Sequence, residues 1–532
     1  MPTRFNFLVT FLLGPALLGC PGDASDGQAP LRILNSTASC LTIAAKFPSG
    51  LAKIPGNDRE AVAIQFDPPA LFRVNLETEP PTSAFVPPPL PEVLSTCSSG
   101  VDSDSDGIAD SDRSVALGIP RCRKPQPGTV RPLDPTRAAV TTSDIEQVLF
   151  LDPRDGSLRH IQLDAPAAGP GFDPDDWFFW PLAGVTPYRT AFSTITCVDG
   201  PGFVDSLGDP ILAPLRCDPL VNGFRTNLTA DVAVVGSRLF VATSNLIQAP
   251  RYAPGTVLVF DYDTSIDPPR VGPHATNAVI LTSAYNATSL TPYQTPSGRD
   301  LLLVGLTGAI QGDGSAAVTP AAIDVVDTDT LTLIATIPLG LTGLGFSGLA
   351  IDPSNRLALA GSALRRQLVG IDLAALDDPT LGLGPQTLPI VLDGMTPGFP
   401  DARVFSESNP FALPKRPDGP LDTVCFSQTS VDIKDDGSFA LASDRCDGTM
   451  TRLFISLPAS RLTAIDPGTV LTVDRRIDVA APLLPSSTGE TRDIGRVLIR
   501  DGTPTVDFQG PDVYYLAGEE AASVCGVRID AL

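Results

Sequence analysis

Short apolar runs separated by turn residues recur along most of the chain. Residues 321–340 read AAIDVVDTDTLTLIATIPLG: an apolar run ending in Asp, a polar DTDT segment and a second apolar run. LLLVGLTG (301–308) precedes this segment, and GLAIDPSNRLALAG (348–361) follows it. Runs of this length, bounded by Gly, Pro, Asp and Asn, are typical of β-strands. The stretch 299–373 is therefore predicted to form strand–turn–strand units joined by a glycine-rich crossing.

Variants of this unit occur elsewhere in the chain. They include DVAVVGSRLFVAT (231–243), SVDIKDDGSFALAS (430–443) and the strands within 495–518, and AVAIQF (61–66) and ALFRVNL (70–76) are further strand candidates. Repeated small sheets can cover both of their faces by stacking radially. The pattern predicts an all-β protein, a β-propeller over residues 31–532 with six to eight blades, seven being favoured.

One stretch departs from a plain repeat, and strand signals resume after it. Residues 77–143 are rich in Pro, Ser and Asp, and we interpret them as an irregular insertion rather than a separate core. In 146–163, DPRDG lies between two alternating runs and predicts a β-hairpin.

Composition narrows the classes of partner. The 46 Gly and 54 Pro among 532 residues favour many turns over long helices. The formal net charge is −23, so the surface repels phosphate backbones and nucleic-acid binding is excluded. Such a surface suits cations or basic partners, or serves solubility alone.

The N-terminal residues MPTRFNFLVTFLLGPALLGC place Arg4 before an apolar run that is short for a membrane-spanning helix. The run ends in Leu17-Leu18-Gly19-Cys20, which resembles a bacterial lipobox. The resemblance implies a signal peptide over 1–19, acylation of Cys20 and a flexible tether over 20–30. Since Pro21 and not Asp follows Cys20, it implies an exported bacterial lipoprotein in the outer membrane, on the periplasmic or surface leaflet. An ordinary signal peptide is the alternative.

Nine cysteines are present, and eight remain after Cys20 is set aside. An even number in an exported chain predicts four disulfides. The spacing favours three local pairs: Cys97 with Cys122, Cys197 with Cys217, and Cys425 with Cys446. Cys40 and Cys525, near the two ends of the chain, are then left to pair with each other. The last pair would join the ends of a closed ring.

Residues 102–112, DSDSDGIADSD, have the oxygen spacing of a calcium loop. The predicted ligands are side chains and one carbonyl, from Asp102, Asp104, Asp106, Ile108, Asp110 and Asp112. An EF-hand would need Glu where Arg113 stands, so the stretch resembles the calcium repeats of thrombospondin type 3 instead. The resemblance implies a structural Ca²⁺, enclosed by the Cys97–Cys122 bridge. A solvated acidic linker is the alternative.

The segment from Val325 to Gly340 resembles the YVTN family of bacterial propeller repeats, in which a V-x-D-T-x-T turn precedes a V-A-T-I-P-x-G strand. The next strand pair departs from the family and ends in LALA (357–360). This resemblance implies a propeller, a fold that serves many functions.

Candidate chemistry is sparse. The only histidines, His160 and His274, form no zinc pair or evident triad, and the G-x-G-x-x-G of 343–348 lacks a following helix. Trp177 and Trp180 are either a core plug or a contact for a partner. Strand-terminal Asp261, Asp327, Asp352 and Asp372 either line one face or cap turns.

These observations favour a non-enzymatic binding or assembly scaffold with an envelope protein or glycan partner. The main alternative is a lactonase-like propeller hydrolase with a metal held in the central channel. An electron-transfer quinoprotein is disfavoured, since no Trp-docking repeat is present.

Overall fold

The structure is a computed structural model, and its described part consists almost wholly of β-strands. It describes residues 33–35, 39–42, 46–67, 70–77, 82–85, 127–143, 146–163, 188–200, 202–211, 223–312, 315–341, 344–352, 356–364, 367–377, 411–412, 429–444, 449–455, 471–478, 494–499, 513–517 and 523–527. Within these ranges the only helical element is the 3₁₀ turn η2 (Leu373–Asp377). The all-β prediction is confirmed.

Seven sheets of four or more strands follow one another along the described chain. The first contains β3 (Lys46–Ile54), β4 (Asn57–Asp67), β5 (Ala70–Asn75) and β6 (Thr82–Phe85). The second contains β7 (Pro127–Asp134), β8 (Arg137–Thr142), β9 (Gln147–Leu151) and β12 (Ala191–Ser193). The third is built on β15 (Thr229–Val235), β16 (Arg238–Thr243), β19 (Pro254–Asp263) and β20 (Arg270–Pro273), and is extended by β10 (Ile161–Leu163), β11 (Tyr188–Arg189) and β21 (Val279–Tyr285).

In the remaining four sheets, strands that are consecutive in the chain pair antiparallel with one another. The fourth contains β22 (Ala287–Gln294), β23 (Asp300–Leu306), β24 (Ala321–Asp327) and β25 (Thr332–Gly340). The fifth contains β26 (Leu344–Asp352), β27 (Leu357–Ser362), β28 (Gln367–Asp372) and β29 (Phe411–Ala412). The sixth contains β30 (Thr429–Ile433), β31 (Phe439–Asp444), β32 (Thr449–Ile455) and β33 (Leu471–Asp478), and the seventh β34 (Ile494–Ile499), β35 (Val513–Ala517) and β36 (Ser523–Val527).

Strands from the N-terminal end complete the last two sheets. The strand β1 (Ile33–Asn35) pairs in parallel with β33, and β2 (Ser39–Thr42) pairs antiparallel with β36. Two further pairs lie outside the seven sheets: β13 (Cys197–Asp199) with β14 (Gly223–Arg225), and β17 (Leu246–Gln248) with β18 (Arg251–Tyr252).

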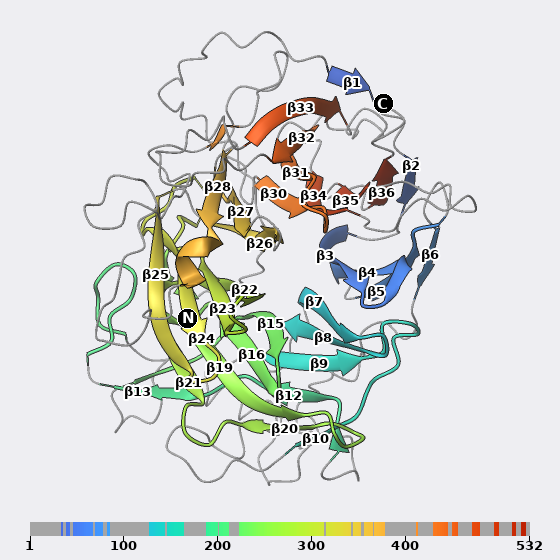
Figure 1. Cartoon of the computed structure of the whole chain (residues 1–532). Helices are drawn as coiled ribbons and strands as arrows, with labels where there is room; N and C mark the ends of the chain where they lie inside the picture. Colours follow the sequence, from blue (N-terminus) through green and yellow to red (C-terminus); the bar gives the residue numbers. More distant parts are fainter. Residues whose placement is uncertain are drawn as a thin grey trace, which may run out of the picture.

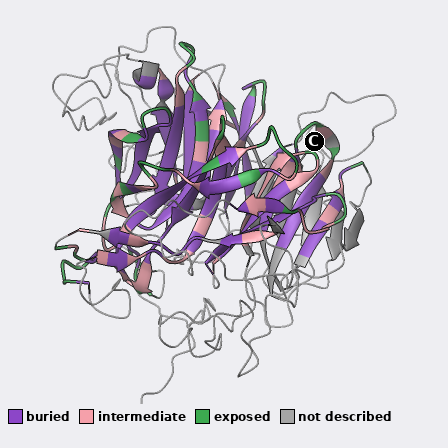
Figure 2. Ribbon diagram, turned by 90° about the horizontal axis from the view of Figure 1, so that it is seen from below, coloured by how far each residue is buried: buried purple, intermediate pink, exposed green. Residues whose placement is uncertain are grey.

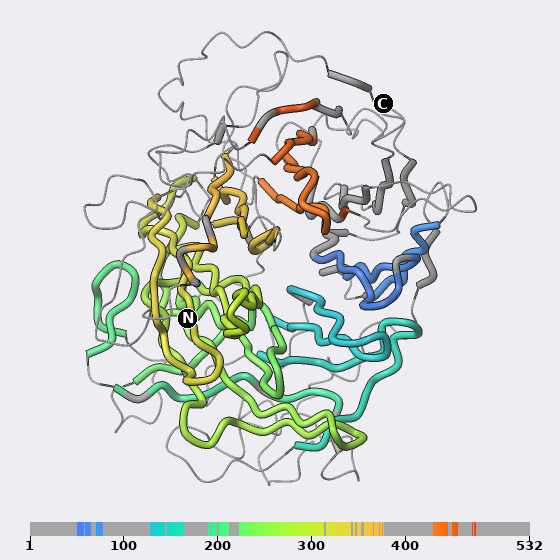
Figure 3. The backbone as a smooth tube through the Cα atoms, in the orientation of Figure 1, coloured from blue at the N-terminus to red at the C-terminus, as the bar shows by residue number. Residues whose placement is uncertain are grey.

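The sheets close into a ring, as a β-propeller requires. The first strands of successive sheets contact one another in the order β3, β7, β15, β22, β26, β30 and β34, and β34 contacts β3. Figure 1 shows these strands around the centre, and Figure 3 shows the chain passing round the ring from blue to red. The predicted propeller is confirmed, and seven sheets fall within the expected range.

Successive side chains of a strand point to opposite faces of its sheet, so each strand contributes to the packing against both neighbouring sheets. In β24, Ile323 and Val325 pack towards the fifth sheet, whereas Ala322 and Val326 pack towards the third. All seven residues of β24 are buried, and five of the seven are Ala, Ile or Val, with Asp324 and Asp327 the two exceptions. Figure 2 shows that buried positions dominate the strands of neighbouring sheets. Burial on both faces therefore removes the polar/apolar alternation of a half-exposed strand.

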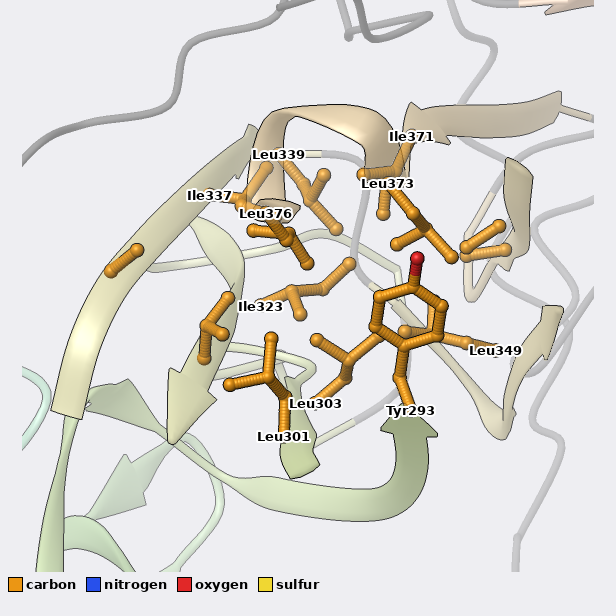
Figure 4. Packing of buried hydrophobic residues seen from close by; sticks show 14 of the residues in the cluster. Tyr293, Leu301, Leu303, Ile323, Ile337, Leu339, Leu349, Ile371, Leu373 and Leu376 are labelled. Carbon is orange, nitrogen blue, oxygen red and sulfur yellow. The ribbon is translucent and has the colours of Figure 1, made fainter. Parts of the chain in front are cut away.

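The cluster between the fourth and fifth sheets is shown in Figure 4. The fourth sheet contributes Tyr293, Leu303 and Ile323, among others, and the fifth contributes Leu349 and Ile371. Leu373 and Leu376 of η2 pack against the same cluster. The 3₁₀ turn thus covers one end of this interface.

Glycines permit close approach between the fifth and sixth sheets. A Cβ atom at Gly361 would lie 2.1 Å from the Thr429 carbonyl oxygen, and one at Gly345 would lie 2.9 Å from the same atom. The glycine-rich crossing that the sequence suggests is therefore a packing requirement at the start of β30.

Two predictions of local structure need correction. The DPRDG turn of the predicted hairpin 146–163 is present, with Leu151 and Leu158 bridged antiparallel across it, but the second run does not continue along β9: β10 pairs in parallel with β20 of the third sheet. The two ends of the predicted insertion 77–143 contain β6, β7 and β8, which belong to the first two sheets, while residues 86–126 lie outside the described residues. The prolines of β7 made its sequence unlike that of a strand. They are tolerated because β7 pairs along one side only, with β8, so they break no second ladder of hydrogen bonds.

Candidate functional site

The inner strands carry an ion pair that joins neighbouring sheets. Arg131 of β7 donates from Nε to Oδ1 of Asp231 at 2.9 Å and from Nη2 to Oδ2 at 2.6 Å. This bidentate geometry matches the planar guanidinium to the carboxylate. The Asp231 side chain is 2% exposed, and that of Arg131 is 30% exposed. The pair therefore lies at the inner boundary of the second and third sheets.

Asp231 also accepts two backbone hydrogen bonds. The Val232 amide donates to Oδ1 at 2.9 Å, and the Leu290 amide of β22 donates to Oδ2 at 2.9 Å. One carboxylate thus connects the second, third and fourth sheets. Four donors occupy the acceptor positions that an ionised carboxylate offers. Burial disfavours the charged guanidinium, but the charge and hydrogen bonds of Asp231 outweigh it and raise the pKa of Arg131.

A second inner carboxylate connects the sixth and seventh sheets. Asp432 of β30 accepts from the Ile433 amide at 3.0 Å and from the Ile499 amide of β34 at 2.7 Å. Burial raises the pKa of Asp432, although both amides and the charge of Lys53 work in the other direction. Lys53 of β3 lies 4.0 Å from the carboxylate of Asp435, on the turn that follows β30. Lys53, Asp432 and Asp435 are three ionisable side chains that lie close together where the first, sixth and seventh sheets meet.

Hydroxyl groups after the second strand of three sheets make a repeated contact with the next sheet. Ser143, Ser244 and Thr307 donate to the carbonyls of Thr229, Ala287 and Leu344, at 3.0, 2.9 and 2.9 Å. Each acceptor lies at the first residue of the next sheet's inner strand. These hydroxyls connect each of the three sheets to the next one.

Two buried carboxylates lie away from the inner strands. Asp152, on the turn after β9, is ion-paired with Arg154 and Arg159. Burial alone would raise its pKa, but the two arginines lower the pKa of Asp152 to about 2.

Asp324 of β24 is held by neutral donors instead. It accepts from the Ser283 amide and hydroxyl at 2.7 and 2.5 Å and from the Thr336 hydroxyl at 2.7 Å. Burial raises the pKa of Asp324, because neutral donors offset the loss of water only in part.

The strand-terminal acids do not converge on one site. Asp327 caps its own turn, accepting from the Asp329 and Thr330 amides, and also pairs with Arg299 at 2.7 Å. Asp261 of β19 contacts Nδ1 of His274, which directly follows β20, at 2.7 Å. Asp352 is buried beside Gly437, and the side chain of Asp372 is outside the described set. Of the two readings of these acids, turn capping holds for Asp327.

Most of the sequence-predicted site residues lie outside the described residues. They are Cys20, the calcium-loop residues 102–112, Trp177, Trp180 and the cysteines at 97, 122, 217, 425 and 446. Cys197 is disulfide-bonded, and its pairing with Cys217 stays a prediction. The backbones of Cys40 and Cys525 are directly paired between β2 and β36.

Two further observations concern only the part of the chain that the structure describes. No group there brings three or more His, Cys, Asp or Glu side chains together in a way that could hold a metal ion. None of its helices has the length and apolar character needed to cross a membrane.

The inner ion pair could have been suspected from sequence. Asp231 interrupts the largely apolar strand TADVAVV, and a charge within a buried strand is rare unless it is paired. The separation of Arg131 and Asp231 in the sequence gives no indication that they are partners. The hydroxyl contacts have a weaker signal, the recurrence of Ser or Thr after the second strand.

No family model matches this chain, and no curated protein matches it. Among solved structures, the Cps50 (Swd1) β-propeller domain of Myceliophteria thermophila is 9% identical, with 91% of this chain and 98% of that chain covered and a TM-score of 0.43. A putative 6-phosphogluconolactonase of Bacteroides fragilis is 10% identical, with 81% and 84% covered and a TM-score of 0.42. Hsv2 of Kluyveromyces lactis is 9% identical, with 82% and 100% covered and a TM-score of 0.33. At these scores the fold assignment rests on the sheet topology itself: the chain is a β-propeller.

Proposed function

We propose that this protein is a lipid-anchored β-propeller of the bacterial cell envelope that acts as a non-enzymatic binding or assembly scaffold. The observation that carries the proposal is the use of the inner carboxylates. Asp231 gives all its acceptor positions to Arg131 and two amides, and Asp432 bonds to the amide of Ile499 in the next sheet. Charged groups that connect sheets in this way stiffen a platform, and Asp231 has no lone pair left for a substrate or metal.

The sequence supplies the remaining parts of the proposal. The lipobox-like Leu17–Cys20 supports attachment to the outer membrane through an acylated Cys20. The segment from Val325 to Gly340, with its resemblance to YVTN repeats, supports a bacterial propeller. The partner would be an envelope protein or glycan, with Trp177 and Trp180 as a contact and the 102–112 loop held by a structural Ca²⁺.

The test is affinity capture of the lipidated protein from crosslinked cell envelopes, with and without calcium chelation. A reproducible envelope partner supports the scaffold, and its loss on chelation gives the 102–112 loop a part in binding. A Cys20→Ala variant is the matched control: it should leave the membrane fraction and lose the partner. A partner retained equally by the soluble variant would argue against anchoring.

A second arm separates the scaffold from the hydrolase alternative. Purified protein loaded with divalent metal is assayed on lactones and esters. An Asp432→Asn variant is assayed beside it, because Asp432 is the inner carboxylate whose acceptor positions are not all occupied by the two amides, and Asn keeps its shape without its charge. We expect no metal-dependent turnover. Turnover that is abolished in Asp432→Asn while the melting temperature is unchanged would contradict the scaffold proposal.

A further inference from the structure

Two cysteines from opposite ends of the chain meet at the edge of the seventh sheet. The strand β2 is the outermost strand of this sheet and pairs with β36. Their register places Cys40 opposite Cys525, flanked by the pairs Ser39–Gly526 and Leu41–Val524. The two cysteines are therefore direct cross-strand neighbours and not merely close in space.

This register meets the backbone requirement of a disulfide. Directly opposed residues of antiparallel strands have Cα atoms about 4.5–5.5 Å apart. Disulfides join residues whose Cα atoms are about 4.4–6.8 Å apart. A slip of the register by one residue would place Cys40 opposite Gly526 or Val524, and no bridge could form there. The paired positions thus coincide with the only two cysteines that the described strands of this sheet contain.

We propose that Cys40 and Cys525 form an interstrand disulfide that fastens the N-terminal strand to the last sheet and locks the ring. The two thiols lose two protons and two electrons, and one S–S bond forms. The electrons pass to the disulfide of a thiol–disulfide oxidant, which is reduced to a dithiol. The inference rests on the export that the proposed function includes, since disulfides persist in oxidising compartments.

A covalent bond is useful at this place because β2 is short and lies at an edge. It spans four residues, Ser39–Thr42, and has a partner on one side only. Short edge strands open most readily in local unfolding. The first sheet follows β2 in the chain, so opening of β2 would remove one of the strand pairings that join the N-terminal end of the chain to the last sheets.

Mass spectrometry of the unreduced full-length protein tests the bond directly. Trypsin releases Cys40 within residues 33–46 and Cys525 within residues 501–528, each peptide with a single cysteine. We expect the linked pair in protein isolated from cell envelopes, resolved into two peptides on reduction. Recovery of both peptides as free thiols from both preparations described next, or of Cys40 linked to a different cysteine, would overturn the inference.

A native oxidation experiment separates the bond from the export that it presupposes. The purified, reduced protein is incubated in a glutathione redox buffer without denaturant, and the same peptides are measured. A linked pair in this buffer together with free thiols in the cell-derived protein would support the Cys40–Cys525 disulfide and count against export. Free thiols in both preparations would overturn the proposed disulfide.

Hydrogen exchange measures the consequence for the ring. In Cys40→Ser and Cys525→Ser, amides of 39–42 and 523–527 should exchange about tenfold faster or more, because the edge strand is no longer covalently held. Thr42→Ser keeps both cysteines and is the matched control, with protection unchanged. Equal protection in all three variants and the unaltered protein would contradict a locking role.

Discussion

The inner ion pair gives the sharpest test of how the sheets are held together. Replacing Asp231 by Asn keeps the size of the side chain but removes its charge and one acceptor oxygen. The Arg131 guanidinium then loses its counterion, and one of the two amides that Asp231 binds loses its acceptor. Because the carboxylate connects three sheets, the loss acts on two interfaces at once.

The magnitude follows from the burial of the pair. Breaking a fully buried ion pair typically costs about 3–5 kcal/mol of stability. Since 30% of the Arg131 side chain is exposed, solvent screens part of this interaction, and we expect about 2–4 kcal/mol for Asp231→Asn. In Arg131→Met together with Asp231→Asn, no unpaired charge remains, so part of the loss should be recovered.

The assay is a double-mutant cycle from equilibrium urea unfolding, followed by far-ultraviolet circular dichroism at neutral pH. The coupling energy between Arg131 and Asp231 should be about 1–3 kcal/mol and persist in added salt. The matched control is the pair Arg59–Glu77, whose side chains are 75% and 38% exposed, with an expected coupling below about 0.5 kcal/mol. An inner coupling as small and salt-sensitive as the control would refute the reasoning.

Three further predictions concern pH and packing. Asp152→Asn should cost about 1–2 kcal/mol at neutral pH, since its partners are partly exposed; because the folded pKa lies near 2, this difference should vanish as pH falls from about 4 to 2 in urea unfolding. Asp324 has a raised folded pKa, so the unaltered protein should lose stability relative to Asp324→Asn as pH rises above about 3.8; an opposite slope would exclude burial as the dominant effect. Gly361→Ala should destabilise by about 1–3 kcal/mol through a clash with a carbonyl, whereas Gly312→Ala, with its nearest atom at 3.7 Å, should leave the melting temperature unchanged.

The strand content was predictable because local composition determines it. The apolar runs at 231–243 and 321–340 correspond to β15, β16, β24 and β25. The choice of partner strand is not local. In 146–163 the sequence contains a turn signal and two apolar runs, yet β10 leaves its neighbour and pairs with β20 of the next sheet. Alternation reports which face a residue occupies, and it does not report which sheet the strand joins.

The candidate site shows the same limit. Nothing near Arg131 in the sequence identifies Asp231 as its partner, because the contact depends on the ring bringing β7 beside β15. The pairing of Cys40 opposite Cys525 was accessible by a different route. After three local pairs are assigned by spacing, only these two cysteines remain, and ring closure gives them a place to meet. Topology, once inferred, was the more informative guide.

The pairing of β1 with β33 and of β2 with β36 has a consequence for biosynthesis. A ribosome delivers β1 and β2 first, but their partners are among the last strands to emerge. Such distant pairing forms slowly, because the intervening chain must be ordered before the strands can meet. Until then the nascent protein would be an open arc with unpaired strand edges at both ends, which favours aggregation. Production of this protein should therefore depend on chaperones that shield strand edges, and removal of its final strand should leave β2 without its partner and expose the edge of β35.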